Sequence, residues 1–223
     1  MSKRLKEAYK SLEEDKAYPL AEALSLLEKS PKVKFDESVE LHFHLYVDAK
    51  QSDQVVRGTT VLPHGTGKKI RIAVFCKGED VIKAENAGAD IVGGEELVEK
   101  VAGGFMDFDC VIATPEMMRF LSKLGKILGP RGMMPSPKAG TVSADVTKAI
   151  DDVKAGKIEF RSDKQAGIHV AIGKRTFNQQ QLTDNAKHII NAIEQVKPNS
   201  IKGQLVKSLY LSSTMGPGIK VNL

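Results

Sequence analysis

The sequence predicts an α/β protein in which both chain ends form an outer α+β domain that carries an inserted, Rossmann-like parallel α/β domain. Three observations support this prediction. Residues 70–128 alternate short apolar runs with amphipathic helical segments. Segments with strict two-residue alternation lie outside that block, near both ends of the chain. The charge balance also differs between the block and the rest of the chain.

The first strand of the outer domain is expected at Leu41 to Val47. Its apolar residues Leu41, Phe43, Leu45 and Val47 alternate with the polar or aromatic residues His42, His44 and Tyr46. Because successive side chains of a strand point to opposite faces, one face should be buried and the other exposed. A half-buried strand of this kind is typical of an antiparallel sheet.

The inserted block repeats a strand and a helix three times. IRIAVF is followed by GEDVIKAENAGA, DIVGG by EELVEKVAGG, and DCVIAT by PEMMRFLSKLGKILG. This order predicts βαβ units and a mainly parallel sheet. In the last helix Met117, Leu121, Leu124 and Leu128 share one face, and Pro115 suits the first helical turn.

The C-terminal part returns to the outer domain. GIHVAIG (167–173) and LVKSLYL (205–211) are predicted strands, and IKVNL is a last short one. A helix is expected from about Asn178 to Val196, and it should bury Leu182, Ile189, Ile193 and Val196. We expect the N-terminal strands to pair with these C-terminal strands.

The predicted boundaries are 1–67 and 157–223 for the outer domain and 68–156 for the inserted one. The connections would be LPHGTGKK (62–69) and KAGK (154–157), which are polar and contain glycine. Paired short linkers permit hinge motion, so Pro63, Gly65, Gly67 and Gly156 are the predicted hinge residues.

Charge supports this division and indicates an anionic partner. Residues 68–156 hold 13 basic and 13 acidic residues, so the remainder holds the whole net charge of +5. Within that remainder, residues 157–223 hold 10 basic and 4 acidic residues. An electrostatic footprint for nucleic acid is therefore expected on the C-terminal part of the outer domain.

Composition excludes several classes of protein. Two isolated cysteines form neither a disulfide framework nor a zinc site, and the absence of Trp argues against a wide base-stacking surface. We see no signal-peptide pattern and no apolar stretch long enough to span a bilayer, so we expect a soluble, cytoplasmic protein with no membrane partner.

Lys123 to Thr141 is a predicted basic loop that keeps its shape without a core. Its 19 residues include four Gly, three Pro and four basic residues, but no acidic one. Gly129, Gly132 and Gly140 permit positive φ, while the prolines restrict φ. It would contact a polyanion or a partner backbone, or it is an ordinary solvated loop; composition alone does not decide.

Motifs for catalysis are missing. GTGKK (65–69) fails the phosphate-loop pattern, because Leu62 replaces its first glycine and Lys69 replaces the hydroxyl that holds magnesium. No Ser or Cys lies in a nucleophile elbow. The histidines lack metal-ligand spacing, so His42 and His44 are interpreted as exposed neighbours on one strand face. We therefore expect no cofactor, no metal and no catalytic residue.

Three segments of the outer domain suit RNA, and each has a plainer alternative. KVKFDES (32–38) offers Phe35 for stacking, or Phe35 covers the edge of the core. RSDKQAGIH (161–169) places Arg161 and Lys164 at a turn, or it is a solvated hairpin. SSTMGPGIK (212–220) offers hydroxyls and glycines for the 2′-OH and phosphate, or it is a turn before the last strand.

These motifs also carry a resemblance to a known family. KLGKILGPRGMMPSPKAGT, VRGTTVLPHGTGK and SSTMGPG, together with FDESVEL, IEFRSDKQAGIHVAIGK and KPNSIKGQ, resemble the bacterial-type L-one family of large-subunit ribosomal proteins. The likeness runs almost from end to end. Met133 and Ser136 depart from it, standing where the family usually has Leu and Asn.

The resemblance implies an outer domain that binds a helical stalk of large-subunit ribosomal RNA beside the tRNA exit site. It also implies help in release of deacylated tRNA and repression of translation from the protein's own operon mRNA. The protein would be cytoplasmic and ribosome-bound, and a monomer when free of the ribosome. The implied RNA contacts are Phe35, Asp163, Lys164, Gly167, His169, Ser208, Thr214, Met215 and Gly216. Secondary RNA or tRNA contacts would be made by Lys126, Arg131 and Lys138.

Two competing hypotheses make different predictions. A nucleotide-dependent enzyme built on the inserted domain would bind nucleotide in an organised phosphate loop. A protein–protein scaffold would bind ribosomal proteins without RNA. The prediction we retain is a non-enzymatic RNA-binding protein with a mobile inserted domain.

Overall fold

Two compact units make up the chain, one formed by Met1–Lys68 and Ile158–Leu223 (unit 1) and one by Lys69–Lys157 (unit 2). The computed structural model describes residues 3–10, 12–13, 16–48, 51, 54–198, 201 and 203–222. The division between the units differs by one residue from the predicted domain boundaries at each crossing. Within the described residues, no helix combines the length and the apolarity needed to cross a membrane.

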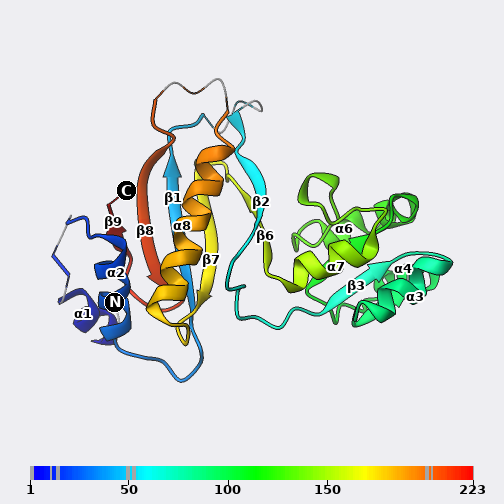
Figure 1. Cartoon of the computed structure of the whole chain (residues 1–223), viewed down its shortest axis with the longest axis horizontal. Helices are drawn as coiled ribbons and strands as arrows, with labels where there is room; N and C mark the ends of the chain where they lie inside the picture. The colour runs from blue at the N-terminus through cyan, green and yellow to red at the C-terminus, as the bar shows by residue number, and fades with distance from the viewer. Residues whose placement is uncertain are drawn as a thin grey trace. The chain divides into compact units, whose positions relative to one another are not determined.

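A four-stranded antiparallel sheet is the centre of unit 1, with strand order β7-β1-β8-β9 (Figure 1). It places the N-terminal β1 between two C-terminal strands, as predicted. A separate two-stranded sheet joins β2 and β6. The strands are β1 (Ser38–Leu45), β2 (Arg57–Val61), β6 (Lys157–Arg161), β7 (Gly167–Lys174), β8 (Val206–Ser213) and β9 (Ile219–Val221).

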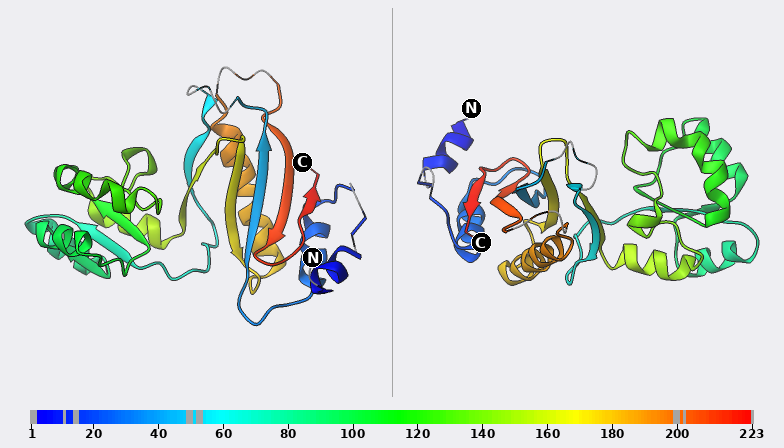
Figure 2. Two further views of the ribbon diagram at one scale, coloured as in Figure 1. Left: turned by 180° about the vertical axis from the view of Figure 1, so that it is seen from behind. Right: turned by 90° about the horizontal axis from the view of Figure 1, so that it is seen from above.

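The helices α2 (Leu20–Lys29) and α8 (Gln179–Gln195) pack on one face of this sheet. Helix α1 (Lys3–Lys10) lies instead beside the turn that precedes β9, where Arg4 Nη2 donates to the carbonyl oxygen of Met215 at 2.8 Å. Seen from behind in Figure 2, left, the strands β7, β1 and β8 lie in front of α8, so α8 leaves their other face open. The core between α8 and the sheet includes Leu41, Phe43 and Ile189, each at most 1% exposed. The alternation along β1 therefore separates a buried face from an open one, as the sequence predicts.

The long helix α8 begins where the sequence supplies a cap. The side chain of Asn178 caps the N-terminal turn, and Gln181 Oε1 accepts a hydrogen bond from Asn178 N at 3.0 Å. Its buried residues include Leu182, Ile189 and Ile193, as predicted. The prediction for Val196 is wrong: Val196 follows the last helical residue and is 37% exposed, because the apolar stripe turns away from the sheet at that point.

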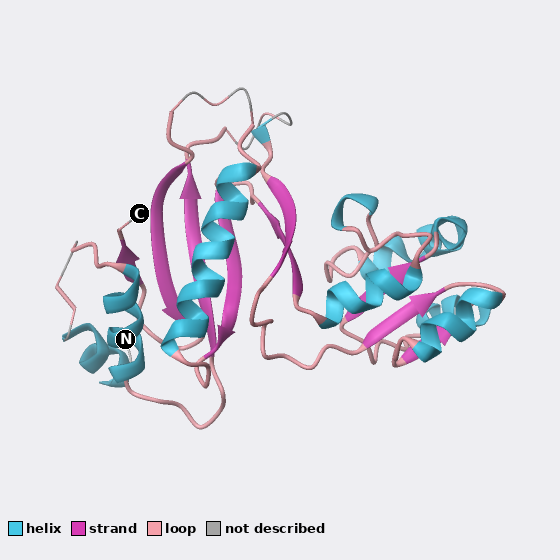
Figure 3. Cartoon of the chain, in the orientation of Figure 1, coloured by secondary structure: helices cyan, strands magenta, loops and turns pink. Residues whose placement is uncertain are grey.

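Unit 2 is a three-stranded parallel sheet with order β4-β3-β5, surrounded by helices (Figure 3). The predicted βαβ arrangement is confirmed. Its strands are β3 (Ile72–Phe75), β4 (Ile91–Gly93) and β5 (Cys110–Ala113), and its longer helices are α3 (Glu79–Asn86), α4 (Glu95–Ala102) and α7 (Val146–Lys154). Helix α7, and α1 and α2 in unit 1, were not among the helices expected from the sequence.

The single helix predicted for PEMMRFLSKLGKILG is wrong. The chain forms short pieces instead: η2 (Pro115–Met117), α5 (Met118–Leu121), η3 (Ser122–Leu124) and α6 (Gly125–Leu128). Ser122 Oγ donates to the carbonyl oxygen of Arg119 at 2.6 Å, and Gly125 weakens the helix further. The predicted apolar face is nevertheless buried, since Met117, Leu121, Leu124 and Leu128 are at most 1% exposed.

Candidate nucleic-acid interface

The open face of the sheet presents polar and aromatic side chains in cross-strand rows. His42 of β1 pairs with His169 of β7 and with Tyr210 of β8. Two residues further along β1, His44 pairs with Gly167 and Ser208. In the other direction, Glu40 pairs with Ala171 and Ser212. The face therefore offers hydrogen-bonding groups on the side of the sheet away from α8 (Figure 2).

A hydrogen-bonded cluster lies at the centre of this face. His42 Nδ1 lies 2.9 Å from His169 Nδ1, and His42 Nε2 lies 2.7 Å from Ser212 Oγ. Burial lowers the pKa of His42, and the nearby His169 lowers it further, against the opposing effect of Glu40. His42 is therefore a positioned, half-buried group. Its interpretation as a simply exposed strand residue is wrong, because no sequence spacing reveals a partner on another strand.

At the end where β1 begins, four of the predicted contact residues gather. Phe35 precedes β1 and is 55% exposed, which rules out its alternative role at the edge of the core. Thr214, Met215 and Gly216 follow the paired end of β8. Thr214 Oγ1 accepts from Ser38 N at 3.0 Å, and Met215 is 51% exposed. Two exposed apolar side chains and a tight turn thus lie at the same end of the face.

A buried ion pair holds this end together. Arg175 Nη1 donates to Glu37 Oε2 at 2.6 Å, and the two side chains are 9% and 1% exposed. Glu37 Oε1 also accepts from Ser213 Oγ at 3.1 Å and from Met215 N at 3.0 Å. Burial opposes ionisation of Glu37, but the hydrogen bonds from Arg175, Met215 N and Ser213, with the Arg175 charge, outweigh it and lower its pKa.

Arg175 extends the same network to helix α2. Its Nη2 donates to the carbonyl oxygens of Leu27 at 2.9 Å and Glu28 at 3.1 Å, and to that of Ser30. These acceptors lie at or just beyond the C-terminal end of α2, where helix carbonyls lack partners within the helix. The pair therefore ties the segment before β1, the turn after β8 and the end of α2 to one another.

At the other end of β1 lie further predicted contact residues. Asp163 Oδ1 accepts from Gln165 N at 2.8 Å and Gly167 N at 2.7 Å, which closes the turn before β7. The Gly167 bond is the largest cause of the lowered pKa of Asp163; burial opposes it, and the Gln165 bond and His169 add to the lowering. Lys164 is exposed in this turn, and Ser208 lies on the open face nearby.

The loop Lys123 to Thr141 belongs to unit 2 and does not stand without a core. Met133 and Met134 pack against the cluster formed by Met117, Leu121 and neighbouring residues, and Ala139 is 4% exposed. Positive φ occurs at Gly132 and Gly140, whereas Gly129 has φ −58° and ends a helix. The side chains of Lys126, Arg131 and Lys138 are exposed. The loop is thus a packed scaffold with a basic outer surface.

Hydrogen bonds hold part of the connecting segment 62–69 against α8. His64 N donates to Asn185 Oδ1 at 3.1 Å, and Asn185 Nδ2 donates to the carbonyl oxygen of Gly65 at 3.0 Å. These bonds attach the stretch around Pro63 and Gly65 to α8. Gly65, Gly67 and Gly156 have positive φ, 64°, 70° and 96°. Hinge motion at Pro63, Gly65, Gly67 and Gly156 stays a prediction.

Sequence reasoning missed Glu37, Arg175 and His42 as organising residues. Glu37 and Arg175 are 138 positions apart, and nothing in the sequence marks them as partners. The available signal for Glu37 was its position, as a charged residue between Phe35 and the apolar alternation of β1. A sequence alone does not distinguish such a buried charge from a charge on the surface.

Other features of the described residues do not add a catalytic or metal site. No group of three or more His, Cys, Asp or Glu side chains within them is arranged to hold a metal ion. Burial is the main cause that raises the pKa of both Cys76 and Cys110 to about 11, so their thiols stay protonated at neutral pH.

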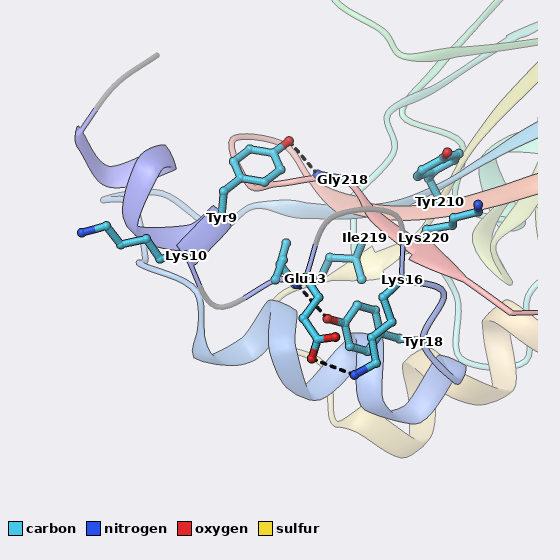
Figure 4. Close-up of a pocket in the computed structure, with 10 residues that line it drawn as sticks. Tyr9, Lys10, Glu13, Lys16, Tyr18, Tyr210, Gly218, Ile219 and Lys220 are labelled. Carbon is cyan, nitrogen blue, oxygen red and sulfur yellow. Dashed lines mark hydrogen bonds and ion pairs between the residues drawn. The ribbon is translucent and has the colours of Figure 1, made fainter.

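A cavity of about 640 Å³ lies between the N-terminal segment and β9 (Figure 4). Lys16 Nζ lies 2.9 Å from Glu13 Oε1, and Glu13 N donates to the Tyr18 hydroxyl at 3.0 Å. Lys10, Lys220 and Tyr210 also line the cavity. Its lining includes none of the predicted contact residues, so we do not include it in the candidate interface.

Comparison with known proteins shows similarity over almost the whole chain. Residues 26–217 match the model of the ribosomal protein L1p/L10e family. The chain is 54% identical over 222 residues to the large ribosomal subunit protein uL1 of Protochlamydia amoebophila (strain UWE25), covering 100% of this chain and 94% of that protein.

Proposed function

Given that the chain belongs to the ribosomal protein L1p/L10e family, we propose that unit 1 binds a helical stalk of large-subunit ribosomal RNA through its open sheet face. Membership makes the chain a ribosomal protein of the large subunit and not an enzyme. On this proposal it works on ribosomes in the cytoplasm, with the stalk lying beside the tRNA exit site, and is a monomer when free.

The observation that supports RNA binding best is the position of the predicted contact residues around the sheet face opposite α8. Phe35, Thr214 and Met215 lie where β1 begins, and Lys164 and Ser208 lie where it ends. Residues separated by up to 180 positions meet there. The basic excess of residues 157–223, with 10 basic and 4 acidic residues, places net positive charge in the same unit.

The two ends of the face offer different chemistry to RNA. Ser208 presents a hydroxyl that can exchange hydrogen bonds with a 2′-OH, which distinguishes RNA from DNA. Thr214 Oγ1, which already bonds the backbone N and O of Ser38, can accept one further hydrogen bond from a 2′-OH. Gly216 lets a phosphate or sugar approach the backbone closely, and Phe35 offers a ring for stacking. Lys164 neutralises phosphate, while Asp163 and Gly167 fix the shape of its turn. His169 contributes a ring nitrogen at the centre.

Two further roles follow as part of the proposal. Lys126, Arg131 and Lys138 give unit 2 an exposed cationic surface for secondary contacts to RNA or exit-site tRNA, brought into use by movement at Gly67 and Gly156. This contact would assist release of deacylated tRNA. The face of unit 1 would also bind the protein's own operon mRNA and repress its translation, through an RNA element that imitates the stalk.

Equilibrium binding to a stalk RNA fragment tests the primary proposal. Thr214→Val keeps the side-chain shape but removes the hydroxyl, and should weaken binding by about 1–3 kcal/mol if its RNA partner is left unpaired. Phe35→Ala should weaken binding as well. Lys187→Ala on the exposed side of α8 is the matched control and should bind like the wild type. Wild-type affinity in both site variants would exclude this end of the face.

A second experiment decides which of the two units carries the RNA interface. Residues 68–156 are replaced by a short Gly-Ser linker, and affinity for the same RNA is measured. Retained affinity supports an RNA-binding site in unit 1, whereas loss of affinity in a folded variant would indicate that the site lies in unit 2. For the secondary contacts, Lys126, Arg131 and Lys138 are changed to Ala, and dissociation of exit-site tRNA from ribosomes should slow.

A further inference from the structure

A second exposed aromatic residue lies at the far end of β1 from Phe35. Tyr46 directly follows the strand and is 55% exposed, the same fraction as Phe35. At about 3.3 Å per residue, the eight residues of β1 that lie between them span on the order of 25 Å. A large apolar ring left in solvent at each end of a proposed RNA-binding face indicates two contact points for one extended ligand.

A β-bulge brings a lysine to Tyr46. In the pairing of β1 with β8, His44 lies opposite Ser208 and Leu45 opposite Val206, so Lys207 is the extra residue. A bulge bends the strand and redirects side chains, which allows Lys207 to project on the same side as Ser208. Lys207 Nζ accordingly lies 5.9 Å from the centroid of the Tyr46 ring.

The surface around Tyr46 is hollowed and cationic. A cavity of about 520 Å³ is lined by His44, Tyr46, Asp48, Lys164 and Lys207, among other residues. Asp48 is the acidic residue of this lining, and it accepts a hydrogen bond from Gln51 Nε2 at 3.4 Å. Within the described part of the chain, neither Lys164 nor Lys207 forms an ion pair with an acidic side chain. The hollow therefore favours an anionic ligand with a flat apolar part.

We propose that Tyr46 is a stacking subsite for an unpaired base of the bound RNA, with Lys207 and Lys164 neutralising the adjacent phosphates. This inference rests on the proposed function, since it extends the same open face beyond the predicted contact residues. Base–aromatic stacking stabilises binding by about 1–3 kcal/mol per base and tolerates any base. Tyr46 thus adds affinity at one end of the face, while the end at Thr214 reads the 2′-OH.

Fluorescence gives a direct test, because the chain has no Trp. In Tyr46→Trp the new indole should be quenched when the full-length protein is titrated with the stalk RNA fragment, since a stacked base quenches it. Lys187→Trp, on the exposed side of α8, should show no such quenching under the same conditions. Equal quenching in both variants, or quenching in neither, would overturn the inference.

Affinity measurements separate stacking from charge. Tyr46→Ala should weaken binding about 5- to 100-fold, whereas Tyr46→Phe keeps the ring and should stay within about twofold of the wild type. Lys207→Ala should reduce the slope of log affinity against log salt by about one. Wild-type binding by Tyr46→Ala overturns the subsite alone, provided that Thr214→Val is impaired. Failure of the wild type to bind stalk RNA overturns the proposed function and the inference with it.

Discussion

Replacing Arg175 by Met should strongly destabilise unit 1, because it leaves the carboxylate of Glu37 buried without its counter-charge. Glu37 is 1% exposed and Arg175 9% exposed, and their charged atoms lie 2.6 Å apart. Removing one partner of such a pair costs about 3–5 kcal/mol. The carbonyl oxygens of Leu27 and Glu28 lose a donor at the same time. The loss is comparable to much of the stability of an ordinary domain.

A second substitution distinguishes the stranded charge from lost packing. Adding Glu37→Gln to Arg175→Met removes the charge but keeps an oxygen that can accept from Ser213 Oγ and Met215 N. The double variant should therefore be more stable than the sum of the single changes, with a coupling of about 0.5–3 kcal/mol. Arg175 Nε has no hydrogen-bond partner among the described residues, so the pair itself carries some cost of burial.

Urea unfolding followed by tyrosine fluorescence is a suitable assay. The four tyrosines, Tyr9, Tyr18, Tyr46 and Tyr210, all lie in unit 1, and the chain has no Trp. The signal therefore reports unfolding of unit 1 without a contribution from unit 2. Glu37→Gln alone, which leaves the Arg175 charge without its partner but keeps its carbonyl acceptors, is the second variant if Arg175→Met does not fold.

The stability deficit of Arg175→Met should depend on pH in a direction that follows from the pKa of Glu37. The lowered pKa of Glu37 means that its stabilisation is present above its unfolded pKa, near 4.5, and is lost as the pH falls through its folded value. Without Arg175, burial raises the pKa of Glu37, so protonation relieves the stranded charge at higher pH. The deficit of Arg175→Met should thus shrink as pH falls from 7 toward 4. A deficit under about 1 kcal/mol at pH 7, or one independent of pH, would refute the reasoning.

The remaining predictions concern the open face. The pKa of His42 is lowered in the folded chain, so the unfolded chain binds more protons as pH falls through 6.5 and stability should decrease from pH 7.5 to 5. His42→Gln should reduce that decrease in urea midpoints measured across the range; an unchanged profile would exclude His42 as the cause. A Cβ on Gly216 would overlap Ser213 Oγ, so Gly216→Ala should lower the unfolding free energy by about 1–3 kcal/mol and weaken RNA binding. Gly218→Ala, which meets no atom within 4 Å, is the control, and equal behaviour of the two would contradict the packing argument. If about five phosphates are neutralised, RNA affinity should fall by roughly two to three decades between 50 and 200 mM salt, and a salt-insensitive complex would contradict the electrostatic contribution.

Local patterns in the sequence determined most of the fold. The two-residue alternation around Phe43 predicted a half-buried strand, and the strand–helix repeats predicted the parallel sheet of unit 2. Periodicity succeeded there because burial of one face is recorded in residues close in sequence. It failed at Pro115–Leu128, where Ser122 and Gly125 alter the backbone while the same apolar residues stay buried.

The interface was predicted in part, by family likeness. The motifs around Phe35 and Thr214 identified the family, and the charge of residues 157–223 indicated the same domain independently. The roles of the individual contact residues remain predictions, which the binding experiments above address.

By itself, the sequence determined the fold class, the family and the basic character of the C-terminal part. Only the tertiary structure decided which side chains meet: Glu37 with Arg175, His42 with His169, and Tyr46 with Lys207. The physical reason is that burial patterns are local, whereas hydrogen bonds and ion pairs form between residues that chain folding brings together from more than 120 positions apart. A sequence shows that a side chain is charged or aromatic, and the packed sheet determines its partner.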